Sequence, residues 1–226
     1  MRTVTAVAHR GDPYRVRENT LPSLRSALER GGDAVEVDVR LTRDGVPVLL
    51  HDPTLERLWG HERPLSALSY DEVRGLTEGG VPTLADALEV CRDARVMVDL
   101  PGADARSVLT IVGAIADCDA DERVYYCADA QTMLKVRAAA PAAEIALTWT
   151  SLAPPRAGLL KAIAPRWLNY RFPLVSRDLA ARVHHDGCLL SAWTPDTKSS
   201  MRRLLDIGVD SITTNRVDVL TALRDS

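Results

Sequence analysis

The sequence predicts an α/β protein, a (β/α)₈ TIM barrel with a small insertion after its second strand. Short β-branched runs alternate with segments of helical period along the whole chain. The 226 residues suit one such barrel, and their 46% apolar content supplies a large core. A doubly wound sheet would share this alternation. Its dinucleotide-binding version lacks support because no GxGxxG stretch follows an expected strand.

Each unit of the barrel is expected to pair a short apolar strand with a helix that covers it. The first helix illustrates the signals, with Thr20 as N-cap, Pro22 in the first turn and Gly31 near the end. Comparable periodic segments follow most of the other strands. The expected strands are residues 3–9, 34–40, 95–100, 123–128, 144–149, 166–171, 188–193 and 210–215, and the expected helices include 21–31, 84–94, 105–118, 129–140, 178–187, 196–208 and 217–226.

The alternation breaks after the second strand. Residues 46–52 form a further strand-like run, and the segment of about residues 53–82 carries Pro, Gly and charge with only short helical pieces. We therefore expect one domain over residues 1–226 with this segment inserted. We expect its larger apolar side chains to form a small core of their own rather than a lid. These side chains are Leu55, Leu58, Trp59, Leu65 and Leu68.

Composition narrows the class of partner and the compartment. A net charge of −3 argues against a general nucleic-acid binder, which would be basic. Four widely spaced cysteines without a CxxC pair predict reduced thiols rather than a disulfide framework or a zinc site. The chain enters a strand within a few residues and has no apolar run approaching about 18 residues. We expect a cytoplasmic protein without a stable membrane anchor.

Acidic side chains fall at the expected carboxyl ends of two strands, where barrels of this type have their active sites. Glu36 and Asp38 are two apart on one strand and so share a face, while the neighbouring valines take the other. Asp99 ends the next strand. Such a cluster needs a cation, a proton or a basic neighbour. Its oxygen ligands suit Mg²⁺, Ca²⁺ or Mn²⁺ better than zinc, and carboxylates bridged to arginines are the alternative.

Two histidines and an arginine accompany these carboxylates. His9 and Arg10 end the first strand, and His51 ends the extra strand-like run. Histidine titrates near neutral pH, so a pair of them can act as base and acid in one displacement. Arg10 offers a fork of donors for a phosphate or a carboxylate. The combination suits metal-assisted cleavage of a phosphodiester, although spacing alone does not choose this reaction over other metal-assisted chemistry.

Taken together, these residues resemble the glycerophosphodiester phosphodiesterase family. The resemblance rests on the order and spacing of the stretches AHRG (8–11), ENT (18–20), GGDAVEVDVRLTRDGVPVLLHD (31–52), VPTLADAL (81–88) and GVDSITTN (208–215). It implies a (β/α)₈ barrel and metal-dependent hydrolysis of a small glycerophosphodiester to glycerol 3-phosphate and an alcohol. By position, His9 and His51 look like the acid/base pair, Glu36 and Asp38 like metal ligands, and Arg10 like a phosphate contact.

The resemblance also implies roles for residues that the pattern alone does not single out. Glu18 matches the family glutamate near the substrate, and Trp193 matches an aromatic wall for the glycerol. The inserted segment matches a small subdomain that shapes access for the substrate. A lysophospholipase D-like activity, which would need an apolar lid, and a catalytically weak binding barrel are the alternatives. The head-group alcohol, the metal, the attacking oxygen (water or a substrate hydroxyl) and the oligomeric state stay open.

The sequence departs from the family pattern at two strand ends. Where the family has Glu-x-Lys, this chain has Asp99 and Pro101, so the carboxylate is shorter and a positive charge is missing. We expect Asp99 to act as the third metal ligand. We expect Arg171, at the end of the sixth strand, to replace part of the missing charge near the substrate. Asn215 stands where the family often has Asp, so the last strand presents a neutral group.

Overall fold

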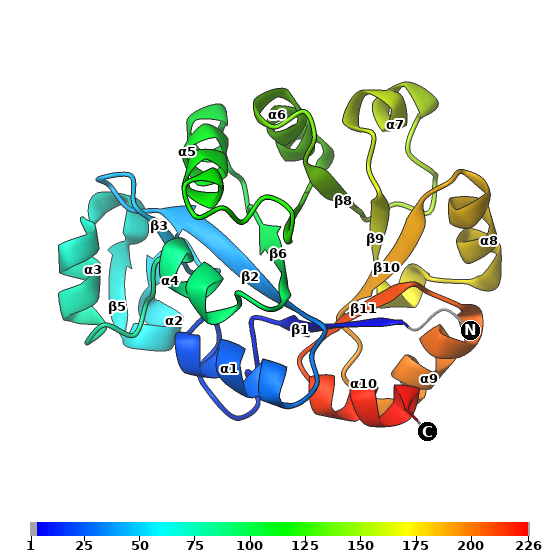
Figure 1. Ribbon diagram of the computed structural model, residues 1–226, viewed down its shortest axis with the longest axis horizontal. Helices are drawn as coiled ribbons and strands as arrows, with labels where there is room; N and C mark the ends of the chain where they lie inside the picture. Colours follow the sequence, from blue (N-terminus) through cyan, green and yellow to red (C-terminus); the bar gives the residue numbers. More distant parts are fainter. Residues whose placement is uncertain (1–3, 226) are drawn as a thin grey trace.

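Parallel strands close on themselves in the computed structural model, which describes residues 4–225 (Figure 1). Within these residues, eight strands follow the order β1-β11-β10-β9-β8-β7-β6-β2, and a further pairing of β1 with β2 completes the barrel. The predicted fold class is therefore confirmed. The strands are β1 (Thr5–His9), β2 (Ala34–Leu41), β6 (Arg95–Asp99), β7 (Val124–Ala128), β8 (Glu144–Trp149), β9 (Trp167–Arg171), β10 (Leu189–Trp193) and β11 (Ser211–Thr214).

Helices follow the strands and cover the outside of the barrel. They are α1 (Leu21–Glu29), α4 (Leu84–Val90), α5 (Ala105–Ala116), α6 (Ala130–Ala139), α7 (Ala157–Ile163), α8 (Arg177–His185), α9 (Lys198–Ile207) and α10 (Val217–Arg224), and the 3₁₀ turn η2 (Phe172–Leu174) precedes α8. The predicted strands agree with the observed ones to within two residues. Residue 3 of the first predicted strand and residue 226 of the last predicted helix lie outside the described residues.

Capping side chains explain where several helices begin. The Thr20 hydroxyl accepts from the backbone N–H of Ser23 at the start of α1, as predicted. Asp104, Asp129, Ser176 and Thr197 cap α5, α6, α8 and α9 in the same way. Asp129 follows β7 directly, Asp104, Ser176 and Thr197 follow short connections, and Thr20 follows the longer turn after β1. These caps therefore determine where the helices begin after the strands.

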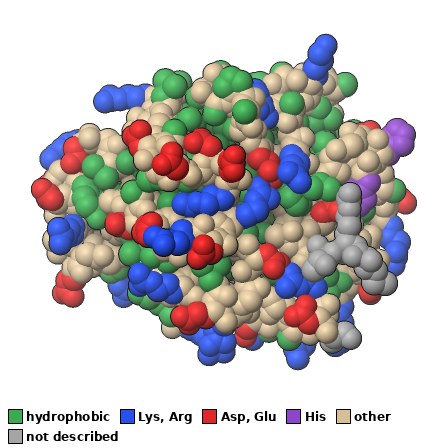
Figure 2. All heavy atoms as spheres, viewed as in Figure 1, with side chains coloured by type: hydrophobic (Ala, Val, Ile, Leu, Met, Phe, Trp, Pro, Cys, Tyr) green, Lys and Arg blue, Asp and Glu red, His purple; other side chains and the backbone are tan. Residues whose placement is uncertain are grey.

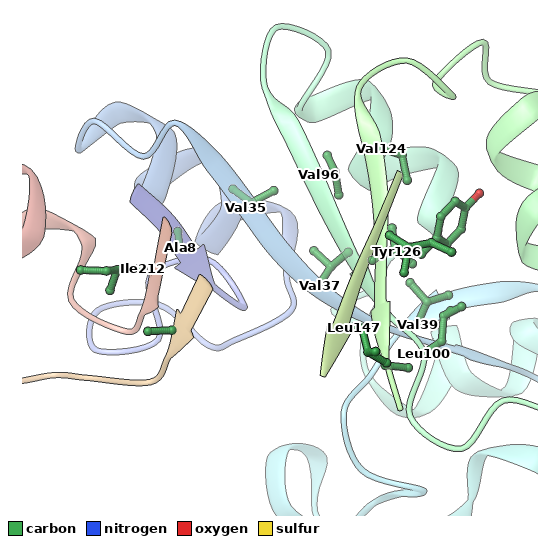
Figure 3. Close-up of a cluster of buried hydrophobic side chains, with 14 of the residues drawn as sticks. Ala8, Val35, Val37, Val39, Val96, Leu100, Val124, Tyr126, Leu147 and Ile212 are labelled. Carbon is green, nitrogen blue, oxygen red and sulfur yellow. The ribbon is translucent and has the colours of Figure 1, made fainter. Parts of the chain in front are cut away.

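The alternation along β2 puts its side chains on two surfaces. Val35, Val37 and Val39 belong to the large core between strands and helices, and Figure 3 shows them along the strand. Glu36 and Asp38 take the opposite face, toward the barrel interior, as predicted. Below them the interior is filled by a smaller apolar cluster of Val7, Ala34, Met97, Tyr125, Cys127, Ala146 and Trp167. The interior is therefore packed beneath the carboxylates and polar at the mouth.

The inserted segment packs as a small unit at one side of the barrel, near α1 and α4 (Figure 1). Its buried apolar side chains form a separate cluster that includes Leu55, Leu65 and Leu68, with Trp59 packed against it. Leu58 is half-exposed and lies outside this cluster. The prediction of an internal core holds for the other four side chains. The elements of the inserted segment are β4 (Thr54–Leu55), α2 (Glu56–Trp59), β5 (His61–Pro64), η1 (Leu65–Ala67) and α3 (Tyr70–Leu76), and β3 (Pro47–Leu49) precedes it.

The extra strand is shorter than predicted. β3 pairs antiparallel with the end of β2 and stops at Leu49. His51 and Asp52 therefore lie in an irregular segment between the barrel and the inserted unit, rather than at the end of a strand. The backbone still ties this segment to the barrel, because the N–H of Leu50 donates to the carbonyl of Asp38 (3.0 Å).

Two further expectations can be compared with the fold. Cys91, Cys118, Cys127 and Cys188 carry free thiols, as predicted. Among residues 4–225, no helix is long and apolar enough to cross a membrane. Acidic and basic side chains are interspersed over the face shown in Figure 2.

Candidate active site

Three carboxyl groups meet at the carboxyl ends of β2 and β6. One oxygen from each of Glu36, Asp38 and Asp99 lies within 4.8 Å of the others. Glu36 and Asp38 are 4% and 1% exposed. Burial, and then the charges of Asp38 and Asp99, raise the pKa of Glu36 well above its usual value. Burial and the charge of Asp38 raise the pKa of Asp99 to about 7. The sequence-predicted cluster is thus assembled, with Asp99 as a full member.

This cluster fits a hard divalent cation. Buried carboxylates keep their charge only beside a compensating cation, and all the donor atoms here are oxygens, which suits Mg²⁺, Ca²⁺ or Mn²⁺. The structure also contains an ion pair of the kind that the alternative expects, because Arg10 Nε lies 3.0 Å from Asp38 Oδ2. One guanidinium offsets one of the three charges. The residues present therefore still fit a doubly charged ion.

Arg10 stands where the chain leaves β1. Its backbone N–H donates to Glu36 Oε2 (3.0 Å), and its Nη1 donates to Glu18 Oε1 (2.9 Å). The turn depends on Gly11, which has a φ of +88° and where an added Cβ would lie 2.3 Å from Ser23 Oγ. Arg10 also lines the cavity, so its guanidinium can donate to an anionic group there.

His9 is held from within the barrel. Its Nδ1 lies 2.8 Å from Oδ1 of Asn215, which follows β11, and its Nε2 lies 3.9 Å from Glu36 Oε2. Burial, and then the charge of Arg10, lower the pKa of His9. The neutral group expected at the end of the last strand is therefore the direct partner of the first histidine.

His51 is held from the inserted segment. Its Nδ1 lies 2.7 Å from Asp52 Oδ1, and the second oxygen of Asp52 accepts from Arg57 Nε at 2.5 Å. Arg57 also donates through Nη2 to Glu18 Oε1 (2.6 Å), the same oxygen that accepts from Arg10. Burial alone would raise the pKa values of Glu18 and Asp52. The hydrogen bonds and charge of Arg57, joined by Arg10 at Glu18 and by His51 at Asp52, together lower both pKa values. One chain of ion pairs thus joins His51 to Arg10.

Arg57 and Asp196 belong to the site but were not predicted from the sequence. Arg57 stands five residues after Asp52 in a short helical piece, and that short spacing was the available signal. Asp196 follows β10 and binds Asn215, which only the folded barrel brings close. Both residues contact other side chains of the site and do not line the cavity.

The cavity at the barrel mouth has a volume of about 300 Å³, at the small end of the range for ligand sites. Its charged wall consists of His9, Arg10, Glu36, His51 and Asp99. Its remaining wall is mostly neutral and is formed by Met97, Leu100, Pro101, Cys127, Ala128, Asp129, Thr148, Asn169, Trp193 and Thr213. This polarity suits a ligand with one anionic centre and an uncharged polar part.

Trp193 and Arg171 were also predicted to lie near the substrate, and only one of them lines the cavity. Trp193 lines the cavity. Arg171 is exposed at the end of β9, with its guanidinium carbon 5.8 Å from the centre of the Trp193 ring, and it lies outside the described cavity wall. The positive charges that act on Asp99 come instead from Arg10 and Arg40. Arg40, on β2, also donates from Nε to the His51 carbonyl (2.8 Å).

Curated relatives match the chain over nearly its full length. The probable glycerophosphodiester phosphodiesterase 2 of Mycobacterium tuberculosis is 31% identical over 95% of this chain and 88% of its own length. A glycerophosphodiester phosphodiesterase of Caldanaerobacter subterraneus is 29% identical, with 96% of each chain covered.

Solved structures share the fold at lower sequence identity. The phosphodiesterase of Oleispira antarctica, solved with the product sn-glycerol-3-phosphate, has a TM-score of 0.90 at 20% identity and covers 98% of this chain and 97% of its own. A putative glycerophosphoryl diester phosphodiesterase from Silicibacter pomeroyi has a TM-score of 0.89 at 21% identity, covering 99% and 94%. Residues 9–219 match the family as a whole. On this match and the relatives above, the chain belongs to the glycerophosphoryl diester phosphodiesterase family and is a phosphodiester hydrolase.

Proposed function

We propose that the protein hydrolyses small glycerophosphodiesters to glycerol 3-phosphate and an alcohol, with a divalent cation and His9 and His51 as the proton-transferring pair. The observation that carries this proposal is the arrangement of one cavity wall. Two histidines, each with Nδ1 already occupied, line it together with Arg10 and carboxylates of the acidic cluster. The relative solved with glycerol 3-phosphate supports this choice of product class.

The chemistry follows from which atoms are left for the substrate. Because Nδ1 of each histidine is hydrogen-bonded, Nε2 of each is the nitrogen left for proton transfer. One histidine takes the proton of the attacking oxygen as the new O–P bond forms. The other gives its proton to the leaving alkoxide oxygen as the old P–O bond breaks. The attacking oxygen belongs to water, which gives glycerol 3-phosphate directly, or to a neighbouring substrate hydroxyl, which gives a cyclic phosphate that water then opens.

Other residues bind and orient the substrate. Glu36, Asp38 and Asp99 would hold the cation, which supplies charge neutralisation at the phosphoryl oxygens when bound. Arg10 donates to the same phosphoryl group, and Glu18 fixes the direction of Arg10. Trp193 borders the neutral wall, where the glycerol would lie. Leu55, Leu65 and Leu68 of the inserted segment are buried in its own core and only Leu58 is half-exposed outside it, so these leucines do not form the apolar lid that an acyl chain would need.

One assay tests the proposal against its alternatives. The purified protein is given glycerophosphocholine or lysophosphatidylcholine, first with EDTA and then with Mg²⁺, Ca²⁺ or Mn²⁺ added back. The expected result is metal-restored choline release from glycerophosphocholine. Release from lysophosphatidylcholine alone would favour the lysophospholipase D-like activity. Folded protein that turns over neither substrate would favour a binding barrel.

A further inference from the structure

The hydrogen bond on His9 is part of a longer chain that ends on a carboxylate. Asn215 Oδ1 lies 2.8 Å from His9 Nδ1, and Asn215 Nδ2 donates to Asp196 Oδ2 (2.8 Å). The other oxygen of Asp196 accepts from the backbone N–H of Asn215 (3.0 Å). Asp196 lies in the loop between β10 and α9, so three separate segments of the barrel meet at this point.

Asp196 determines which way the Asn215 amide faces. A carboxylate only accepts hydrogen bonds, whereas an amide has one donating end and one accepting end. If the amide were reversed, Asn215 Oδ1 would face a carboxylate oxygen with no proton between them. The NH₂ group must therefore face Asp196 and the carbonyl must face His9.

The same reasoning then determines the proton on His9. The Asn215 carbonyl carries no proton, so the nitrogen facing it, Nδ1, must be the donor. In neutral His9 the lone pair is consequently on Nε2, which faces the carboxylate side of the cavity, 3.9 Å from Glu36 Oε2. The backbone of β11 does not set the orientation of the Asn215 amide, because Asn215 contacts His9 through its side chain.

We propose that Asp196 and Asn215 are positioning residues that hold neutral His9 as its Nδ1–H tautomer, leaving the Nε2 lone pair free to accept a proton. The link from tautomer to catalysis rests on the proposed function, whereas the tautomer itself does not. Neither residue needs to touch the substrate. Their effect passes through His9 alone.

A swap of the two side chains separates this role from a merely structural one. In Asp196→Asn, the backbone N–H of Asn215 keeps the new carbonyl oxygen in place, so the new NH₂ group faces residue 215. The Asn215 amide then reverses and turns its NH₂ toward His9, which forces Nδ1 to accept and moves the proton to Nε2. Adding Asn215→Asp restores an acceptor opposite Nδ1, because a carboxylate can accept from both neighbours.

The tautomer is read by long-range ¹⁵N–¹H correlation spectra of the imidazole rings, with His9→Gln used to assign the signals. We expect Nδ1–H in the wild type, Nε2–H in Asp196→Asn and Nδ1–H again in the double variant. An Nε2–H signal in the wild type would overturn the proposal, and this measurement needs no variant to fold other than the assignment control. An unchanged tautomer in folded Asp196→Asn would overturn it as well.

Kinetics on glycerophosphocholine form the second arm. We expect Asp196→Asn to lower kcat by at least about 10²-fold with little change in KM, as for loss of a general base. The double variant should recover most of this loss, whereas a purely structural contact would make it at least as poor as the single one. Asp206→Asn, exposed on α9, is the matched control and should keep wild-type kcat. Tautomers that switch as expected while His9→Gln keeps normal kcat would refute the role of His9 and leave the tautomer assignment standing.

Discussion

His9 and His51 line the same cavity, but they belong to two differently built parts of the molecule. His9 ends β1, and its partner Asn215 follows β11, the strand that pairs with β1 in the barrel. His51 lies in an irregular segment, and its contacts lead through Asp52 to Arg57 of the inserted unit. Their side chains are 19% and 41% exposed. The barrel therefore fixes one histidine through its sheet, while the inserted unit fixes the other through ion pairs.

This difference shows where the site can be altered without disturbing the fold. Barrel strands are hydrogen-bonded on both sides, so changes near His9 act on the most cooperative part of the structure. The inserted unit has its own small core, separate from the barrel core. The inserted unit can therefore lose stability, and with it the support of His51, while the barrel stays folded.

Loss of either histidine is expected to have a similar effect despite the different supports. His9→Ala and His51→Ala should each lower kcat by roughly 10²- to 10⁴-fold, the usual contribution of acid–base groups. His185→Ala, whose side chain is 88% exposed on α8, is the matched control and should be unaffected. Steady-state kinetics with metal present measure the change. Near-normal kcat in either active-site variant removes that histidine from the mechanism.

Truncation of one leucine in each core should separate the two parts of the molecule. Leu65→Ala and Leu190→Ala both remove buried side chains, at a cost of about 2–5 kcal/mol. We expect Leu65→Ala to speed hydrogen exchange mainly between β4 and α3 and to lower kcat through His51. Leu190→Ala should instead lower the stability of the whole barrel. Equal exchange throughout the chain in both variants would mean that the inserted unit has no independent stability.

The fold was predictable because its signals are local and repeated. The valines of β2 and the cap at Thr20 are read directly from the order of residues, and both occupy the predicted places. The shorter β3 was missed because apolar residues continue to Leu50, although the strand stops at Leu49 and Leu50 keeps only one backbone hydrogen bond to β2. At the end of β3 the hydrophobic pattern indicates that the residues are buried, but it does not indicate where strand pairing ends.

The acidic cluster was predictable because its residues lie toward the carboxyl ends of parallel strands. Glu36, Asp38 and Asp99 meet because parallel strands bring their carboxyl ends to one rim. Arg57 and Asp196 were not found because each acts on another side chain across a loop, and no periodicity marks such contacts. The position of Arg171 over Trp193 likewise depends on side-chain direction, which strand spacing does not determine.

Arg57 tests whether the ion-pair chain supports His51. In Arg57→Ala, Asp52 and Glu18 both lose a donor, so we expect kcat to fall about 10- to 100-fold, corresponding to about 1.5–3 kcal/mol for hydrogen bonds to charged groups. Arg63→Ala, on β5, loses only its pairing with Glu72 at the surface and serves as the control. An equal effect of the two variants on kcat would show that the inserted unit acts through its fold and not through Arg57.

The smallest effect is expected for Arg171, which was predicted to replace part of the charge of the missing family lysine. It is exposed and stacks near Trp193, and such exposed cation–π contacts contribute about 0.5–1 kcal/mol. Arg171→Ala should therefore change kcat/KM by about fivefold at most. Arg40→Gln makes the comparison informative, because Arg40 binds the His51 carbonyl and its charge acts on Asp99. We expect the larger loss there. If Arg171→Ala proves the more damaging variant, Arg171 on β9 supplies the positive charge that replaces the family lysine. The neutral wall of the cavity would then owe part of its substrate binding to a charged residue beside it.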